Sequence, residues 1–135
     1  MRIVLIDTDV LSFFFRGHER VVAQFERYTQ EFGAINLSMI TYYEVLSGLL
    51  HKDAHKQLEK FQTFVAASNL LPLSKLAVEK AAELYGTKRK RGTPVDDIDL
   101  LIAGIALAHD MGIVTRNTAH FEQLPGVYIE NWLES

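Results

Sequence analysis

The sequence predicts an α/β fold: a single domain over residues 1–135, in which helices cover both faces of a central, mostly parallel sheet as an α/β/α sandwich. Short apolar runs such as "IVLI" at 3–6 and "GIVT" at 112–115 are rich in β-branched residues, which is typical of buried strands. Longer segments with helical spacing separate these runs. A chain of 135 residues, 48% of them hydrophobic, is large enough to bury one substantial core.

Strands and helices are expected to alternate along the chain. Gly17 separates the first two helices, Ser74 is placed to cap a later one, and Gly92 and Pro94 indicate a loop. The predicted strands lie at 3–6, 33–38, 70–73, 112–115 and 126–132, and the predicted helices at 10–15, 19–31, 40–50, 54–68, 75–91 and 96–111. In a sheet of this kind, functional residues gather where the strands end, which directs attention to 7–9, Ser38 and 115–117.

Composition narrows the class of protein. The chain has no cysteine, so it forms neither disulfides nor thiolate metal sites, and a reducing cytoplasm is expected. No apolar run has the length of a membrane span, and the apolar run at the N-terminus is too short for a signal-peptide core. The net charge of -3 does not by itself indicate a nucleic-acid-binding protein.

Basic residues are nevertheless concentrated at one place. Lys88, Arg89, Lys90 and Arg91 stand together at the end of a predicted helix, and Arg116 is a second, isolated candidate. Either group could contact RNA phosphates. The cluster could equally complement the dipole of its helix while remaining in solvent.

The segment "IDLLIAGIALA" at 98–108 contains a single polar residue, Asp99. A helix that is apolar on every side is buried, and a buried carboxylate is costly unless it is paired or bound to a metal. The alternative is an end effect: if Asp96 caps the helix, Asp99 falls at the third helical position, where the dipole favours a negative charge. Asp96 and Asp97 suit capping and first-turn roles in solvent.

Asp7 and Glu44, like Asp99, could each serve a functional site or a helix cap. Asp7 ends the strand "IVLI" and is expected to point into the crevice above the sheet, or else to cap the next helix, although Asp9 suits that cap better. Glu44 either forms a capping box with Thr41 or faces a ligand together with the small residues that follow on its helix. Carboxylates that converge from separate segments repel one another without a cation, and oxygen ligands suit Mg²⁺ or Mn²⁺.

Several short motifs follow one another in a characteristic order. The chain reads "IDTDVL" at 6–11, "TYYEVLSG" at 41–48, "GTPVDDIDLLIAGIALA" at 92–108 and "VTRNTAHF" at 114–121, and closes with "PGV" and "NW" within 125–132. In this order and spacing the sequence resembles the PIN-domain nucleases, specifically the VapC-type toxins of bacterial toxin–antitoxin pairs. The resemblance spans nearly the whole chain.

The resemblance implies a metal-dependent endoribonuclease. It assigns the metal-binding, catalytic carboxylates to Asp7, Glu44 and Asp99, with Asn117 completing the catalytic site and Mg²⁺ or Mn²⁺ as the cofactor. It also implies an RNA substrate, a homodimer, and a cognate antitoxin whose tail covers the site. Two positions depart from the usual pattern: Asp9 replaces an Asn, and His120 stands where many relatives carry Asp.

Two alternatives use the same residues differently. A phosphotransferase of the haloacid-dehalogenase type would use Asp7 as nucleophile, Asp9 as acid and base, and Ser38 from the second strand. That family, however, needs a later acidic pair at the end of a strand, and here the pair follows no strand. A PIN-like module that binds RNA or protein without catalysis is the second alternative.

Other side chains have simpler explanations. His51 and His55 have the spacing of a zinc pair on one helix but lack the accompanying acid, so exposed histidines are favoured. The aromatic residues of "SFFFRG" at 12–17 and of "YY" at 42–43 are expected to pack in the core, or else to line a dimer or antitoxin groove. Trp132 is expected to pack.

Overall fold

A five-stranded parallel sheet forms the centre of the molecule. The computed structural model describes residues 1–91 and 96–134, with the backbone alone at 88–91. The strand order is β3-β2-β1-β4-β5, and every neighbouring pair is parallel. The strands are β1 (Val4–Ile6), β2 (Asn36–Ser38), β3 (Asn69–Leu71), β4 (Gly112–Val114) and β5 (Ile129–Glu130).

Helices connect these strands, so the predicted α/β class is confirmed. Ser74 Oγ accepts a hydrogen bond from the Ala77 backbone N–H at 3.1 Å, as expected for a helix cap at that point. No described helix is long and apolar enough to cross a membrane. The helices are α1 (Thr8–Phe15), α2 (Glu19–Phe32), α3 (Met39–His51), α4 (His55–Ala66), α5 (Lys75–Arg91), α6 (Asp97–Ala108) and α7 (Thr118–Glu122).

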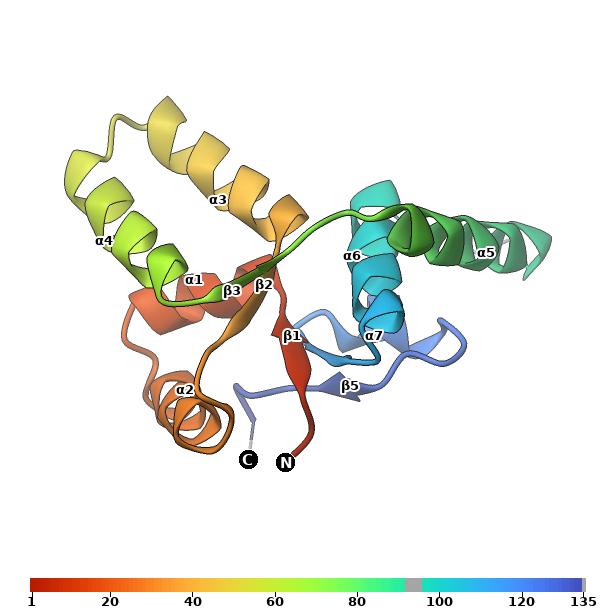
Figure 1. Cartoon of the computed structure of the whole chain (residues 1–135), viewed down its shortest axis with the longest axis horizontal. Coiled ribbons are helices and arrows are strands. Elements are labelled where there is room, and N and C mark those ends of the chain that lie inside the picture. Colours follow the sequence, from red (N-terminus) through yellow and green to blue (C-terminus); the bar gives the residue numbers. More distant parts are fainter. Residues whose placement is uncertain (92–95, 135) are drawn as a thin grey trace.

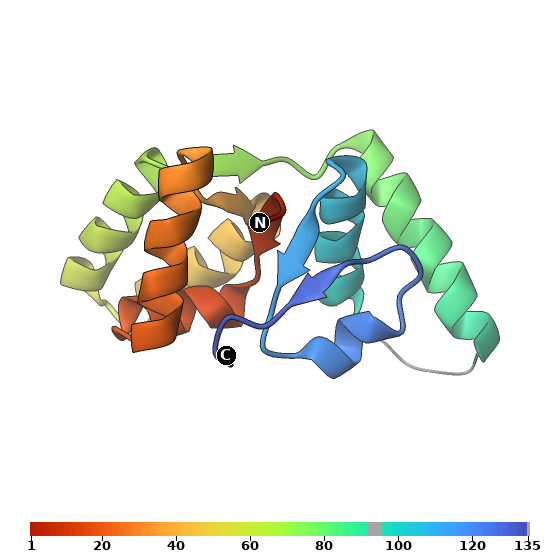
Figure 2. The ribbon, with the colours of Figure 1, turned by 90° about the horizontal axis from the view of Figure 1, so that it is seen from below.

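Each strand sends alternate side chains to the two faces of the sheet. Val4 and Ile6 belong to a core cluster that they share with α1, α2 and α4, whereas Leu5 belongs to a second cluster with α5, α6 and α7. Figures 1 and 2 show α1–α4 on one side of the sheet and α5 and α6 on the other. Two hydrophobic cores therefore hold the sheet between two helical layers.

The close approach of α5 explains why α6 is apolar on every side. Gly104 lies against α5: a Cβ at this position would collide with the carbonyl oxygen of Ala77 and would lie 3.0 Å from Ala81 Cβ. The residues of α6 from Ile102 to Ala106 are all buried between α5 and the sheet. Burial on both sides makes α6 a rigid support for the carboxylates at its start.

Several predicted boundaries were too generous. The helix expected over 96–111 ends at Ala108, because Asp110 adopts a left-handed backbone with φ of 54° and turns the chain toward β4. Gly33, with φ of 91°, delays the strand expected at 33–38 until Asn36. The strand expected at 126–132 is ordered as a strand only at its centre. Helix α7 was not predicted.

Candidate functional site

The carboxyl ends of β1 and β4 bring two polar residues together at the centre of the sheet. Asp7 follows β1 and Thr115 follows β4. Thr115 donates a hydrogen bond from Oγ1 to Asp7 Oδ2 at 2.9 Å, and the Thr8 backbone N–H donates to Asp7 Oδ1 at 2.9 Å. In the sheet, β2 lies on one side of β1 and β4 on the other, so the strand order reverses between β1 and β4. Asp7 and Thr115 therefore lie at the topological switch point, where α/β proteins place their sites.

Asp7 is also the N-terminal cap of α1. The expectation that Asp9 suits this cap better was wrong, because the helix begins at Thr8, directly after the extended residue that ends the strand. Asp9 consequently falls in the first turn of α1. The cap and the crevice location were weighed as alternatives for Asp7, and its side chain satisfies both, with 5% of its surface exposed.

The electrostatics of this edge disfavour ionisation. The pKa of Asp7 is raised from 3.8 to about 7, mainly by burial and next by the charge of Asp9, while the hydrogen bonds from Thr115 and Thr8 lower it. Asp99 adds a smaller repulsion. The pKa of Asp9 is raised in the same way, first by burial and also by the charge of Asp99. Three carboxylates therefore crowd one another, and a cation would relieve the repulsion.

Asp9 is the least satisfied of these carboxylates. Both carboxylate oxygens are buried and have no hydrogen-bond partner. The backbone amides of Val10 and Arg116 and the Arg116 guanidinium lower its pKa, but they do not reach hydrogen-bond geometry. A buried carboxylate oxygen without a donor is strongly unfavourable unless a positive ion fills the position.

Asp99 lies where the capping argument predicted. Asp96 accepts a hydrogen bond from the Ile98 N–H at 2.8 Å and caps α6, and Asp99 follows at the third helical position. Its side chain remains 19% exposed and lies 3.0 Å from Nδ1 of His120, measured to Asp99 Oδ2. His120 comes from α7, so the unpredicted helix brings an imidazole to the candidate site. Asp96 and Asp97 are exposed, as expected.

Glu44 is not part of a capping box, so that alternative was wrong. Ser38 caps α3 and accepts a hydrogen bond from the Thr41 N–H at 3.0 Å, which leaves Glu44 in the second turn. Glu44 Oε1 accepts a hydrogen bond of 2.7 Å from the Thr8 hydroxyl, which also lies 3.0 Å from Thr41 Oγ1. Thr8 thus links Glu44 to the start of α1, directly beside Asp7.

The remaining candidates lie around this centre. Asn117 precedes α7 and is exposed; its backbone N–H donates to Thr115 Oγ1 at 3.0 Å, and its side chain makes no capping bond. Arg116 is exposed, with its guanidinium 5.8 Å from the centre of the Phe13 ring. The side chains of Lys88, Arg89, Lys90 and Arg91 lie outside the described residues, as does the loop expected at Gly92 and Pro94.

The donor set suits a divalent cation in chemistry. Its members are carboxylates, which Mg²⁺ and Mn²⁺ prefer, and two of them, Asp7 and Asp9, have pKa values raised by burial and by neighbouring carboxylates. Within the described part of the chain, no three His, Asp or Glu side chains come close enough together to hold a metal ion. Binding would therefore require these side chains to move closer to one another.

Three threonines complete the candidate site, and the sequence reasoning did not assign them. Thr115 orients Asp7, Thr8 connects Asp7 to Glu44, and Thr41 supports Thr8. All three threonines lie within the quoted motifs: Thr8 in "DTD", Thr115 in "VTRN" and Thr41 at the start of "TYYE". A threonine between charged residues is common enough that its position alone does not indicate a site.

The structure also places the remaining residues that the sequence singled out. His51 ends α3 whereas His55 begins α4, so they do not share one helix and both are exposed. Trp132 is buried in the core, as expected. Asp96 and Asp97 stand at a helix start, which is not the strand-end position that the haloacid-dehalogenase pattern requires.

Comparison with known proteins agrees with this geometry. A family model of the PIN domain matches residues 4–127. The chain is 29% identical over 121 residues to Ribonuclease VapC1 of Methanocaldococcus jannaschii, covering 90% of this chain and 80% of that protein. It is 26% identical over 129 residues to the tRNA(fMet)-specific endonuclease VapC of Salmonella typhimurium, covering 95% and 96%.

Solved structures share the fold. DNA-bound VapBC from Salmonella typhimurium superposes with a TM-score of 0.86 at 26% identity, covering 98% of this chain and 99% of that one. VapBC2 from Rickettsia felis, bound to a DNA fragment from its promoter, gives a TM-score of 0.88 at 23% identity, with 96% and 98% covered. The chain therefore belongs to the PIN domain family, and it resembles the VapC members of that family along nearly its whole length.

Proposed function

We propose that this protein is a metal-dependent endoribonuclease that acts as the toxin of a toxin–antitoxin pair. The observation that carries the proposal is the crowding of Asp7, Asp9 and Asp99 at the switch point, where burial and mutual repulsion raise the pKa of the first two. Relatives named as a ribonuclease and as an endonuclease support the same activity.

Asp7, Glu44 and Asp99 would hold Mg²⁺ or Mn²⁺, and Asn117 would complete the site with its amide oxygen or by orienting a water molecule. When bound, such an ion activates water and steadies the charge that develops on a phosphodiester during displacement. Asp9 adds charge beside Asp7, and its free oxygens would support the ion from behind.

The protein's own residues supply positioning and protonation. Thr115 and the Thr8 N–H hold both oxygens of Asp7 in one orientation, and the Thr8 hydroxyl holds Glu44 beside it. Without a cation, Asp7 retains a proton for part of the time near neutral pH, because its pKa is about 7. To hold a cation, Asp7 would give up that proton and take its ionised form.

The proposal extends to partners. VapBC complexes among the structural neighbours support a cognate antitoxin as the protein partner of this chain. RNA is the proposed substrate, a homodimer the proposed assembly, and the cytoplasm the proposed location.

Cleavage of RNA by the purified, antitoxin-free protein tests the proposal. With Mg²⁺ or Mn²⁺ we expect cleavage of a total-RNA pool, and with EDTA we expect none. Asp99→Asn should lower the rate by about a hundredfold or more, since it removes a proposed ligand. Asp97→Asn is the matched control: it removes the same charge from the same helical turn, but on an exposed side chain, and should cleave normally. Absence of cleavage with either metal would refute the nuclease, and a phosphoenzyme on Asp7 would favour the phosphotransferase.

A further inference from the structure

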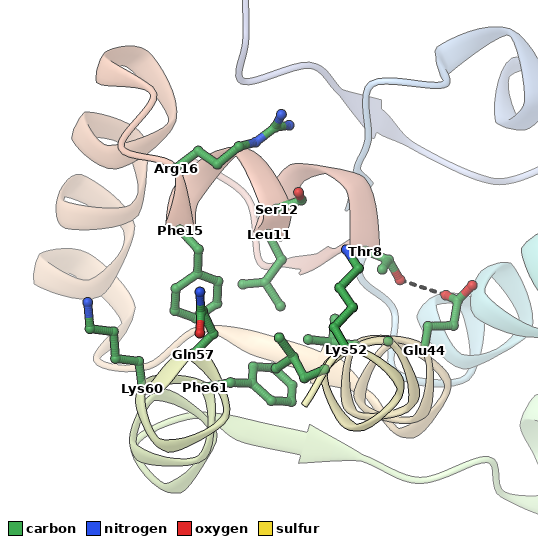
Figure 3. Close-up of a pocket in the computed structure, with 13 residues that line it drawn as sticks. Thr8, Leu11, Ser12, Phe15, Arg16, Glu44, Lys52, Gln57, Lys60 and Phe61 are labelled. Atoms are coloured by element: carbon green, nitrogen blue, oxygen red, sulfur yellow. Dashed lines mark hydrogen bonds between the residues drawn. The ribbon is translucent and has the colours of Figure 1, made fainter. Parts of the chain in front are cut away.

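A cavity of about 640 Å³ opens beside the candidate site, between α1, α3 and α4. Its floor is apolar and includes Leu11, Val45 and Phe61. Thr8 and Glu44, joined by their hydrogen bond, line one end of the cavity (Figure 3). The volume is within the range of about 300–1,000 Å³ that is usual for pockets that bind small molecules. The cavity is therefore large enough for part of a substrate and reaches Glu44, one of the proposed metal-binding carboxylates.

Three cations line this cavity, one from each neighbouring segment. Arg16 follows α1, Lys52 follows α3, and Lys60 lies in α4; all three are exposed. Figure 3 shows the Lys52 side chain reaching across the cavity toward Thr8, with Lys60 at the opposite end. Among the described residues, the only salt bridge joins His120 to Asp99, so none of these cations is neutralised by a carboxylate. In a chain with a net charge of -3, Lys52 and Lys60 thus carry positive charge that no described carboxylate pairs with, and the Arg16 guanidinium lies 4.5 Å from the centre of the Phe13 ring.

An exposed aromatic ring accompanies the cations. Phe15 is 42% exposed and lines the cavity (Figure 3). Its ring packs edge-on against Phe61 and Phe64, which hold it in place. A fixed ring beside free cations is the combination with which proteins bind single-stranded nucleic acids, through base stacking and phosphate contacts.

We propose that this cavity binds the stretch of the single-stranded RNA substrate that adjoins the scissile phosphate, with its phosphates on Arg16, Lys52 and Lys60 and a base against Phe15. The inference rests on the proposed ribonuclease function. A strand whose phosphate lies at Asp7 and Glu44 must continue past them, and the cavity begins at Glu44. The carboxylates themselves do not attract phosphates, so the phosphates that flank the scissile one would be held by neighbouring basic side chains. An acidic protein segment would also meet these cations; the exposed ring of Phe15 beside them favours a nucleic acid, whose bases can stack on it.

Binding measured apart from cleavage tests this inference. The probe is a fluorescein-labelled, mixed-sequence RNA of about 12 nucleotides, a length within the usual footprint of single-strand binders. All proteins carry Asp99→Asn so that the probe stays intact, and fluorescence anisotropy is recorded over a range of salt concentrations. Because phosphate contacts are independent of sequence, the parent protein should bind this probe.

Lys52→Gln combined with Lys60→Gln should weaken binding about tenfold, and should reduce the slope of log affinity against log salt by about 1.4, or 0.7 per lost contact. Lys56→Gln combined with Lys75→Gln is the matched control, because it removes two charges from exposed lysines that do not line the cavity. Equal losses in both pairs, no loss in either, or no binding by the parent protein would each overturn the inference. Cleavage of RNA by the protein without Asp99→Asn would still decide the proposed function separately.

Phe15→Leu distinguishes RNA from an acidic protein segment. It keeps an apolar side chain against Phe61 and Phe64, and circular dichroism verifies that the protein stays folded. We expect RNA affinity to fall about fivefold or more, the usual effect of losing one stacked base, while affinity for poly-L-glutamate stays unchanged. Two results would overturn the assignment to RNA. One is that Phe15→Leu binds RNA as tightly as the parent protein does. The other is that the affinities for RNA and for poly-L-glutamate depend equally on Lys52 and Lys60.

Discussion

Two buried polar clusters lie on the same sheet and differ in almost every property. The first surrounds Asn36 in β2, whose Nδ2 donates to the Val4 carbonyl and to the Tyr28 hydroxyl, both at 3.0 Å. Asn69 Nδ2 donates in turn to Asn36 Oδ1 at 2.9 Å. This cluster is uncharged, and each amide group has a partner.

The second cluster, at the carboxyl ends of β1 and β4, contains Asp7, Asp9 and Asp99. Thr115 donates a hydrogen bond to Asp7, but both oxygens of Asp9 lack a partner. The charges of Asp9 and Asp99 raise the pKa of Asp7, and the charge of Asp99 raises the pKa of Asp9. A polar cluster that serves only the fold can complete its own hydrogen bonds, as the Asn36 cluster does. A cluster that leaves buried charge uncompensated is stable in its ionised form only with a further, positively charged component.

Replacing a carboxylate by an amide in the second cluster should stabilise the protein, whereas replacing an amide by a carboxylate in the first should destabilise it. The largest effect is expected at Asp7. Its pKa of about 7 exceeds the value of 3.8 in the unfolded chain, so the folded protein binds the proton more tightly. The stability that this proton contributes is fully present below about pH 4 and is lost as the pH rises through 7. In EDTA, Asp7→Asn should therefore match the wild type near pH 4 and exceed its free energy of unfolding by about 4 kcal/mol near pH 8. Urea unfolding followed by circular dichroism across this range measures the difference, and a constant difference would contradict the prediction.

The reverse exchange, Asn36→Asp, should destabilise the protein by about 3 kcal/mol at pH 7. It replaces two donated hydrogen bonds with a buried carboxylate that faces the Val4 carbonyl. The measurement is the same urea titration. Metal affinity per folded molecule should stay unchanged, since Asn36 lies outside the carboxylate cluster; a changed affinity would show that the two clusters are coupled.

Adding the missing charge should reverse the instability of the second cluster. At a Mg²⁺ or Mn²⁺ concentration about a hundredfold above the dissociation constant, the wild type should gain about 2 to 3 kcal/mol of unfolding free energy. Asp7→Asn should gain less, because it lacks one proposed ligand. Thermal unfolding with each metal and with Ca²⁺ measures the gain. Equal stabilisation of the wild type and Asp7→Asn would contradict a site at Asp7.

The smallest effect is expected at His120, whose 58% exposed side chain pairs with Asp99. His120→Ala should change stability by less than about 1 kcal/mol, as is usual for exposed pairs. Its affinity for Mg²⁺ should rise by up to about fivefold, because the cation no longer displaces an imidazole from Asp99. Isothermal titration calorimetry measures this affinity. A fall in affinity would instead make the imidazole a ligand.

Local patterns predicted most of the fold. Periodicity identified the strands and the buried α6, and the caps at Ser74 and Asp96 lie where expected, since each depends on neighbours a few residues away. Two caps were predicted at the wrong residue: Ser38 rather than Thr41 caps α3, and Asp7 rather than Asp9 caps α1. Helix α7, with five residues, is too short to give a periodic signal.

The sequence by itself determined the class of fold, which carboxylates are candidates for the site, and the resemblance to PIN-domain nucleases, because residue type and local spacing carry that information. Tertiary structure alone decided which groups meet. Thr115 and Asp7 are 108 residues apart and form a hydrogen bond because β4 pairs with β1. The cavity between α1, α3 and α4 arises in the same way, from three segments whose separate sequences do not indicate a shared surface. Strand order and helix packing are set by the burial of whole faces, and local sequence patterns do not specify them.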